Sequence, residues 1–195
     1  MSTTTKAPSN WNIANALTLL RIALVPLFAF LMLHGDGQET SWRIGAAVVF
    51  AAAIITDRID GDLARNWGLV TDLGKIADPI ADKALIGAAL IALSLIGELW
   101  WWVTGLVLFR ELGITVMRFF MIRYGVMAAG RGGKAKTVAQ SVAILLMVCP
   151  LPAVVEPVAY VCMAVAVGLT LVTGLDYVAQ AVRLRRSSGT SDPAA

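Results

Sequence analysis

The sequence predicts an all-α integral membrane protein with six transmembrane helices, and three observations support this class. Hydrophobic residues make up 58% of the 195 residues and charged residues only 15%, against about 45–50% and about 25% in soluble domains. The apolar residues form six continuous runs, as expected for successive bilayer-spanning helices. The basic residues fall almost entirely on one side of these runs, which is typical of membrane topology.

The N-terminal region is expected to contain a tail, a surface helix and the first span. Residues 1–9 are polar and are expected to be disordered. Trp11–Ala16, with one Trp and two Asn, predicts a short helix on the inner membrane surface. Ile22–Leu33 is the first apolar run, and it is expected not to be a cleavable signal peptide because no basic stretch directly precedes it.

Five more spans are expected from the runs that follow. They are Ile44–Thr56, Ala84–Gly97, Leu99–Phe109 with an extension to Met117, Val138–Leu151 and Val158–Leu175. Several runs are shorter than the roughly 20 residues that a span needs, so charged flanking residues must complete them. Charged side chains at membrane depth face a protein interior or a wet cavity, and a polar cavity is therefore expected on one side of the bundle. The membrane domain is expected to cover residues 10–186, followed by a polar tail over 187–195.

The distribution of charge predicts which side this cavity faces. With the N-terminus inside, 14 of the 16 Lys and Arg residues fall in inner segments; Arg43 is the exception in an outer connection, and Arg110 lies within a run. By the positive-inside rule, both termini and the cavity face the cytoplasm of a cell-membrane protein. Trp100–Trp102 falls at the outer interface and is expected to form an aromatic belt. Cys149 and Cys162 lie in separate apolar runs and are expected to be reduced.

Four carboxylates form the most informative pattern. Asp57 and Asp60 lie one turn apart on one expected helix, and Asp78 and Asp82 lie one turn apart on the next. A short loop around residues 67–73 makes the two helices antiparallel neighbours, so the four acids can converge. Because four like charges repel, and because no His or Cys is nearby, oxygen-preferring Mg²⁺ or Mn²⁺ is the expected counter-ion. Two such ions about 4 Å apart would clamp phosphoryl oxygens.

The residues between the acids suit a phosphate ligand. Gly61 and Ala64 keep the acidic helix face small, and Arg65 offers a planar fork for phosphate oxygens. Thr71 supplies a hydroxyl nearby, and Gly74 opens the next helix without a side chain.

Eight positions define the whole pattern: Asp57, Asp60, Gly61, Ala64, Arg65, Gly74, Asp78 and Asp82. The pattern resembles the signature of the CDP-alcohol phosphotransferase family without a mismatch. Asn12–Arg21, Arg110-Glu111 and Gly133–Thr137 resemble the phosphatidylglycerophosphate synthase branch of that family, with Ala14 where a proline is usual. The similarity covers nearly all of residues 10–186.

The resemblance implies roles for these residues. Asp57 and Asp78 would bridge two metal ions, Asp60 and Asp82 would each complete one metal site, and Asp82 would also act as general base. The cytidine diphosphate group of CDP-diacylglycerol would be held by a second set of residues: Gly61, Arg65 and Thr71, with Asn15 and Thr18 from the first helix. The implied reaction is displacement of CMP by an alcohol at the lipid-linked phosphorus. A homodimer among membrane lipids is also implied, and no nucleic-acid partner is expected.

A second, basic cluster bears on the acceptor alcohol. It consists of Arg110, Arg118, Lys134 and Lys136. A phosphorylated acceptor needs such a pocket, whereas serine does not, so glycerol 3-phosphate is favoured. Inositol phosphate remains the alternative because it also carries a phosphate.

A divalent-cation transporter is the alternative from a different class. It would place acids near the bilayer midplane, with access to both faces and often with inverted repeats. The acids of this chain instead crowd the inner mouth, and no internal repeat is visible. The enzyme is therefore preferred.

Overall fold

The computed structural model describes residues 13–67, 72–121 and 131–189, and these contain helices and short connections but no strand. Within these ranges, side chains are described except at residues 14, 60–67, 72–79, 118–121, 131–134 and 184–189. The elements are α1 (Ile13–Leu33), the 3-10 turn η1 (His34–Gly37), α2 (Thr40–Trp67), α3 (Asp72–Leu95), α4 (Trp101–Met121), α5 (Arg131–Val148) and α6 (Glu156–Gly189). The predicted all-α class is confirmed for this part of the chain.

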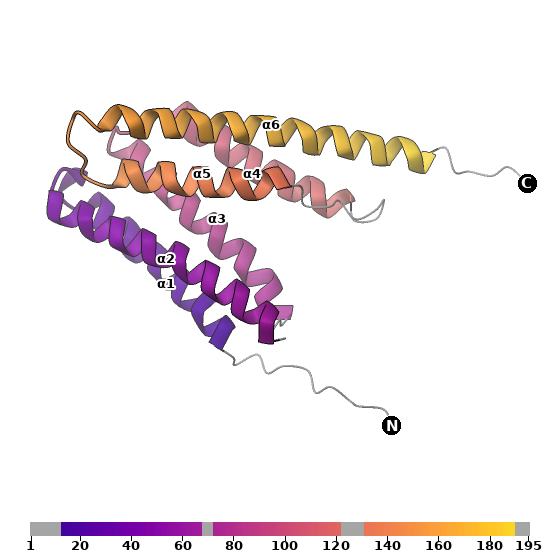
Figure 1. Cartoon of the computed structure of the whole chain (residues 1–195), viewed down its shortest axis with the longest axis horizontal. Helices are drawn as coiled ribbons and strands as arrows, with labels where there is room; N and C mark the ends of the chain where they lie inside the picture. The colour runs from indigo at the N-terminus through magenta and orange to yellow at the C-terminus, as the bar shows by residue number, and fades with distance from the viewer. Residues whose placement is uncertain (1–12, 68–71, 122–130, 190–195) are drawn as a thin grey trace, which may run out of the picture. The chain divides into compact units, whose positions relative to one another are not determined.

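The chain divides into two compact units (Figure 1). The first unit is Met1–Glu98 with Val148–Pro150, so it contains α1, η1, α2 and α3. The second unit is Leu99–Met147 with Leu151–Ala195, so it contains α4, nearly all of α5, and α6.

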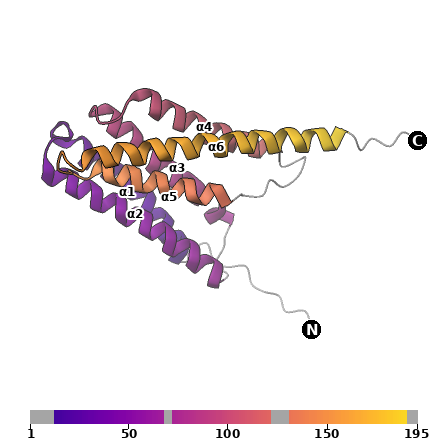
Figure 2. The same ribbon diagram turned by 45° about the horizontal axis from the view of Figure 1, so that its top comes forward.

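In the first unit, α1 packs against both α2 and α3. Figures 1 and 2 both show α1 and α2 running side by side. The rings of Phe28 and Phe50 join them, with centroids 5.5 Å apart. Ala46 and Ala53 of α2 and Ala89 of α3 are fully buried. Small side chains of this kind let helix backbones approach closely, and this explains how α1 contacts two helices at once.

The connection from α1 to α2 is a tight turn that depends on glycine. Gly35, Asp36 and Gly37 all have positive φ, at 60°, 55° and 69°, a region that glycine occupies without steric cost. A Cβ atom added at Gly37 would lie only 2.7 Å from Cγ2 of Ile96. This position therefore requires glycine both for its backbone conformation and for its contact with the end of α3.

An ion pair fastens the same end of the first unit. Arg43 Nη1 lies 2.7 Å from Glu98 Oε1, and Arg43 Nε donates to the Val148 carbonyl oxygen at 3.2 Å. The pair joins the start of α2, the connection after α3 and the end of α5. Arg43, the one basic residue that the sequence places in an outer connection, is thus neutralised by the carboxylate of Glu98.

In the second unit, α4 packs against α6. Val103 and Val107 are buried on α4, and Met163 and Ala166 are buried on α6. A smaller cluster follows, in which Tyr177 and Ala181 of α6 pack with Ile114 and Met117 of α4.

Exposed apolar side chains and two long helices mark a membrane protein. Large apolar side chains face outward from both units; Val48 of α2 is 63% exposed and Phe109 of α4 is 80% exposed. Within the described residues, Asn15–Gly37 and Glu156–Arg183 are long and apolar enough to cross a bilayer, and Ala135–Val148 is apolar but shorter. The predicted membrane class agrees with these features, while the count of six spans stays a prediction.

The predicted surface helix is not a separate element within the described residues. Ile13–Ala16 forms the first turn of α1, which continues without a break to Leu33. The physical reason is that Leu17–Leu20 contains no helix breaker and is rich in leucine, a strong helix former. Trp11 and Asn12 lie outside the described residues.

Candidate active site

Three charged side chains from three helices meet in the first unit. Arg21 of α1 places Nη1 2.7 Å from Asp57 Oδ1 of α2 and 2.9 Å from Asp82 Oδ1 of α3. The Arg21 side chain is fully buried, whereas the side chains of Asp57 and Asp82 are 35% and 50% exposed. One guanidinium nitrogen therefore joins the two halves of the predicted carboxylate pattern, and each carboxylate keeps part of its surface open.

The division of α1 into apolar and polar halves explains why Arg21 points inward. Its buried positions are Asn15, Thr18, Arg21, Phe28 and Met32, at spacings of three, three, seven and four residues. These spacings keep all five side chains on one side of a helix. The stripe is apolar toward the C-terminal end of α1 and polar toward its N-terminal end, so a single helix face serves first as packing surface and then as part of the site.

Asn15 and Thr18, predicted to reach the cytidine diphosphate group, lie on this polar stripe. Asn15 is 4% exposed and Thr18 is 2% exposed. Both are thus on the same side of α1 as Arg21, and that side packs against the two helices that carry the acids.

The other residues predicted to bind the donor or the metal ions lie in α2, in α3 or between them. Because α2 runs unbroken from Thr40 to Trp67 and α3 from Asp72 to Leu95, Asp60 lies one helical turn beyond Asp57, and Asp78 lies one turn before Asp82. The side chains of Asp60, Gly61, Ala64, Arg65, Thr71, Gly74 and Asp78 lie outside the described residues. The described side chains contain no group of three metal-ligating residues, and the four-carboxylate site stays a prediction.

The two described carboxylates fit a hard divalent cation. Their Oδ1 atoms lie 2.7 Å and 2.9 Å from the same nitrogen atom, so the two oxygens are at most 5.6 Å apart. Carboxylate oxygens that converge from two helices are the ligand type that Mg²⁺ and Mn²⁺ prefer. Asp57 and Asp82 would hold such a cation together with the two acids one turn away.

A second charged cluster lies in the second unit. Glu111 of α4 accepts from its neighbour Arg110 at 3.0 Å and forms an ion pair with Lys136 of α5. Arg110 Nη2 also donates to Thr173 Oγ1 of α6 at 2.7 Å. Two of the four predicted acceptor-site cations, Arg110 and Lys136, are thus brought together across helices by Glu111. The side chains of Arg118 and Lys134 lie outside the described residues.

The Arg110 guanidinium is held closely against α6. Its Cζ lies 6.0 Å from the centre of the Tyr177 ring. A Cβ atom added at Gly174 would lie 3.3 Å from Arg110 Nε. Gly174 therefore leaves room for the arginine, while Thr173 and Tyr177 fix its direction.

Comparison with known proteins identifies the family. Residues 11–172 match the CDP-alcohol phosphatidyltransferase family. The chain belongs to this family. It is the family that the carboxylate pattern resembles, and the matched region includes Arg21, Asp57 and Asp82 as well as Arg110, Glu111 and Lys136.

Relatives within the family carry more specific names. The chain is 54% identical over 172 residues to a "Probable phosphatidylglycerophosphate synthase" of Mycobacterium tuberculosis strain H37Rv, covering 88% of this chain and 82% of the relative. It is 38% identical to a CDP-diacylglycerol–glycerol-3-phosphate 3-phosphatidyltransferase of Bacillus subtilis, covering 86% and 93% of the two chains. An Escherichia coli K12 protein of the same name is 35% identical, with 88% and 95% covered.

Two site residues of this family member were missed by the reading of the sequence. Arg21 belongs to the Asn12–Arg21 motif, but no role is predicted for it, and Thr173 is not among the predicted site residues. The signal for Arg21 was present, because its spacing from Asn15 and Thr18 places it on the buried face of α1. Nothing in the local sequence of Thr173 indicates its contact with Arg110, since the partner lies 63 residues away.

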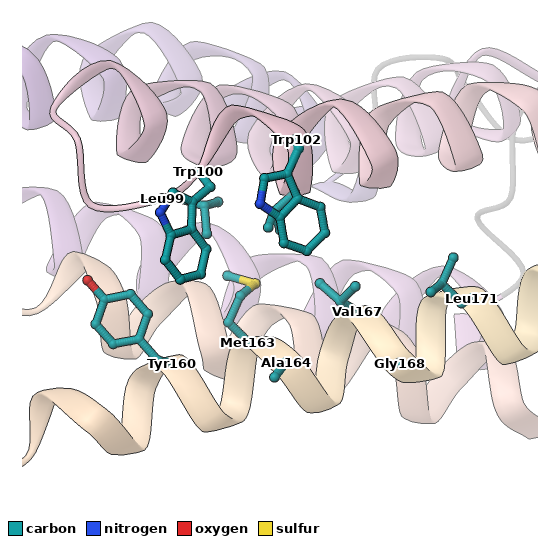
Figure 3. Close-up of a pocket in the computed structure, with 10 residues that line it drawn as sticks. Leu99, Trp100, Trp102, Tyr160, Met163, Ala164, Val167, Gly168 and Leu171 are labelled. Carbon is teal, nitrogen blue, oxygen red and sulfur yellow. The ribbon is translucent and has the colours of Figure 1, made fainter.

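An apolar cavity of about 350 Å³ lies elsewhere in the second unit (Figure 3). Trp100, just before α4, and Trp102, in its first turn, point toward Met163 and Val167 of α6, and Tyr160 lies at one end of the cavity. All three residues of Trp100–Trp102 are largely exposed. The lining contains no charged side chain, so this cavity is unsuited to a phosphate and is not assigned to the reaction.

Proposed function

We propose that this family member transfers the phosphatidyl group of CDP-diacylglycerol to glycerol 3-phosphate, forming phosphatidylglycerophosphate and CMP. The observation that carries the chemistry is the meeting of Asp57 and Asp82, from the two halves of the family pattern, at Arg21. The choice of acceptor is supported by the names of the relatives and by the cluster of Arg110 and Lys136.

The donor is proposed to bind beside the acidic helices. The residues that would hold its cytidine diphosphate group are Asn15, Thr18, Gly61, Ala64, Arg65, Thr71 and Gly74. Asp57, Asp60, Asp78 and Asp82 would hold two divalent cations, Mg²⁺ or Mn²⁺, and the positive charge of these ions would offset the negative charge of the diphosphate and of the leaving CMP.

In the proposed reaction, the acceptor hydroxyl oxygen attacks the phosphorus that carries the diacylglycerol. The new bond joins this oxygen to phosphorus, and the bond that breaks joins the same phosphorus to the oxygen that leaves with CMP. Asp82 accepts the hydroxyl proton as general base. Its half-exposed carboxylate is consistent with a group that must reach a diffusing substrate.

Arg110, Arg118, Lys134 and Lys136 are proposed to bind the phosphate of the acceptor. Guanidinium and ammonium donors form strong charge-assisted hydrogen bonds to phosphate. Glu111 holds Arg110 and Lys136 together, and it removes part of the repulsion between two cations that face the same ligand.

The chain is also proposed to cross the cell membrane six times, with both termini and the active site in the cytoplasm. The concentration of basic residues in alternate connections supports this topology. The homodimer remains a proposal from the family resemblance, and chemical cross-linking in native membranes tests it.

The deciding experiment is CMP release by the purified chain in detergent with CDP-diacylglycerol and Mg²⁺. Glycerol 3-phosphate, inositol phosphate and serine are compared as acceptors, and chelation of the metal with EDTA provides the blank. Release with glycerol 3-phosphate alone is expected. Release with inositol phosphate alone would overturn the acceptor but retain the carboxylate chemistry. Absence of release with all three acceptors would overturn the proposed function, and uptake of Mn²⁺ into vesicles would then test transport.

A further inference from the structure

Among the described charged side chains of the candidate active site, Arg21 is the most deeply buried. Its side chain has no exposed surface, and it lies on the polar half of the α1 stripe. A buried cation is costly unless oppositely charged groups compensate it. Asp57 of α2 and Asp82 of α3 both compensate the charge of Arg21, so the arginine links two different helices.

The position of Arg21 Nη1 between the two carboxylates also determines where the two carboxylates lie. Without a cation, Asp57 and Asp82 would repel each other and turn outward, since both are partly exposed. The single Nη1 atom between them draws both Oδ1 atoms toward one point. A guanidinium is planar, permanently charged and rigid, so it fixes this point more sharply than a flexible ammonium would.

We propose that Arg21 is a positioning residue, which holds Asp57 of α2 and Asp82 of α3 in the arrangement that binds the divalent cations. It acts through the two carboxylates and is not itself assigned a contact with substrate. The inference rests on the proposed function, because it takes these acids as metal ligands. Groups that hydrogen-bond to metal-ligating side chains typically change metal affinity by about 10- to 100-fold when they are removed.

The test measures Mn²⁺ binding by electron paramagnetic resonance of the free ion, using the full chain in detergent without substrate. Arg21→Met removes the charge, and Arg21→Lys keeps the charge but loses the fork. Arg43→Met is the matched control, because it also breaks an arginine–carboxylate pair of the first unit, at the end where α2 begins. Thermal unfolding in EDTA reports the stability of each variant without metal.

We expect the Kd for Mn²⁺ to rise about 10- to 100-fold in Arg21→Met, with a smaller rise in Arg21→Lys and no change in Arg43→Met. A Kd within threefold of wild type in both Arg21 variants would overturn the proposal. An equal rise in Arg43→Met would also overturn it, because the effect would then reflect general loosening of the unit. If Arg21→Met does not fold, Arg21→Lys decides the outcome.

The same measurements separate this proposal from the proposed function. Wild-type chain that binds Mn²⁺ but releases no CMP with glycerol 3-phosphate would overturn the function, and the Kd ratios would still decide the role of Arg21. Wild-type chain that binds no Mn²⁺ would overturn the role of Arg21 together with the metal-dependent chemistry.

Discussion

Replacement of Gly174 by alanine is expected to weaken binding of glycerol 3-phosphate without weakening the fold. The added Cβ would lie 3.3 Å from Arg110 Nε and 3.5 Å from Arg110 Cγ. Favourable contacts between non-bonded heavy atoms lie at about 3.5–4.0 Å, so the guanidinium must move away by a few tenths of an ångström. That movement lengthens the 2.7 Å hydrogen bond from Arg110 to Thr173.

The size of the effect follows from this hydrogen bond. A hydrogen bond that involves a charged group contributes about 1.5–3 kcal/mol, and loss of roughly half of it costs about 1 kcal/mol. The KM for glycerol 3-phosphate should therefore rise about fivefold, while the KM for CDP-diacylglycerol stays unchanged. Helix stability should not fall, because alanine is favoured over glycine inside a helix by about 1 kcal/mol.

Gly168→Ala is the matched control on the same helix. A Cβ atom there meets nothing within 4 Å, so it gains the same helix propensity without touching Arg110. Initial rates of CMP release across a range of glycerol 3-phosphate concentrations compare the two variants. An unchanged KM in Gly174→Ala, or an equal change in both variants, would refute the reasoning that Gly174 makes room for a phosphate-binding arginine.

Three further predictions follow from the described contacts. Asp82→Asn should retain metal-dependent binding of CDP-diacylglycerol but lose CMP release, because the base is removed while one metal site is only weakened. Replacement of the exposed acid Asp176 by Asn is the control. Wild-type turnover in Asp82→Asn would contradict the role of general base. Lys136→Met should raise the KM for glycerol 3-phosphate about tenfold or more, since it removes a charge-assisted contact with phosphate. Steady-state kinetics measure this KM. A selective rise in the KM for CDP-diacylglycerol would instead assign the lysine to donor binding. Arg43→Met should destabilise the first unit by about 1–3 kcal/mol, because it leaves the part-buried Glu98 without its arginine partner. A thermal unfolding temperature equal to that of wild type would show that this ion pair contributes nothing to stability.

Helix existence was predictable from hydropathy, but the start of α1 was not. The first apolar run begins at Ile22, whereas the described helix begins at Ile13. The extra turns contain Asn15, Thr18 and Arg21, which are polar yet buried. Hydropathy treats polar residues as surface, so it cannot recognise a helix face that is buried against charged partners.

The candidate site was predictable where residues share one helix, and less so across helices. The one-turn spacing of the aspartates follows from helical period alone, and Arg110 and Glu111 are adjacent in sequence. The contact between Glu111 and Lys136 instead depends on the register of α4 against α5, which no local pattern encodes. The common contact of Asp57 and Asp82 with Arg21 likewise depends on how three helices pack.

The ion pairs of Arg21 also bear on the order in which the helices of the first unit can enter the membrane. Asp82 follows Arg21 by 61 residues, so at about 5–20 residues per second the ribosome needs about 3–12 seconds to supply this partner. Before Asp57 and then Asp82 have been made, the charge of Arg21 lacks one or both of its partners, and an uncompensated charge costs about 2.5–3.5 kcal/mol at the centre of a bilayer. The apolar half of α1, with Phe28 and Met32, can enter the lipid first while Arg21 stays at the water interface. Completion of α1 insertion then waits for α2 and α3, and this links biogenesis of the first span to assembly of the catalytic acids.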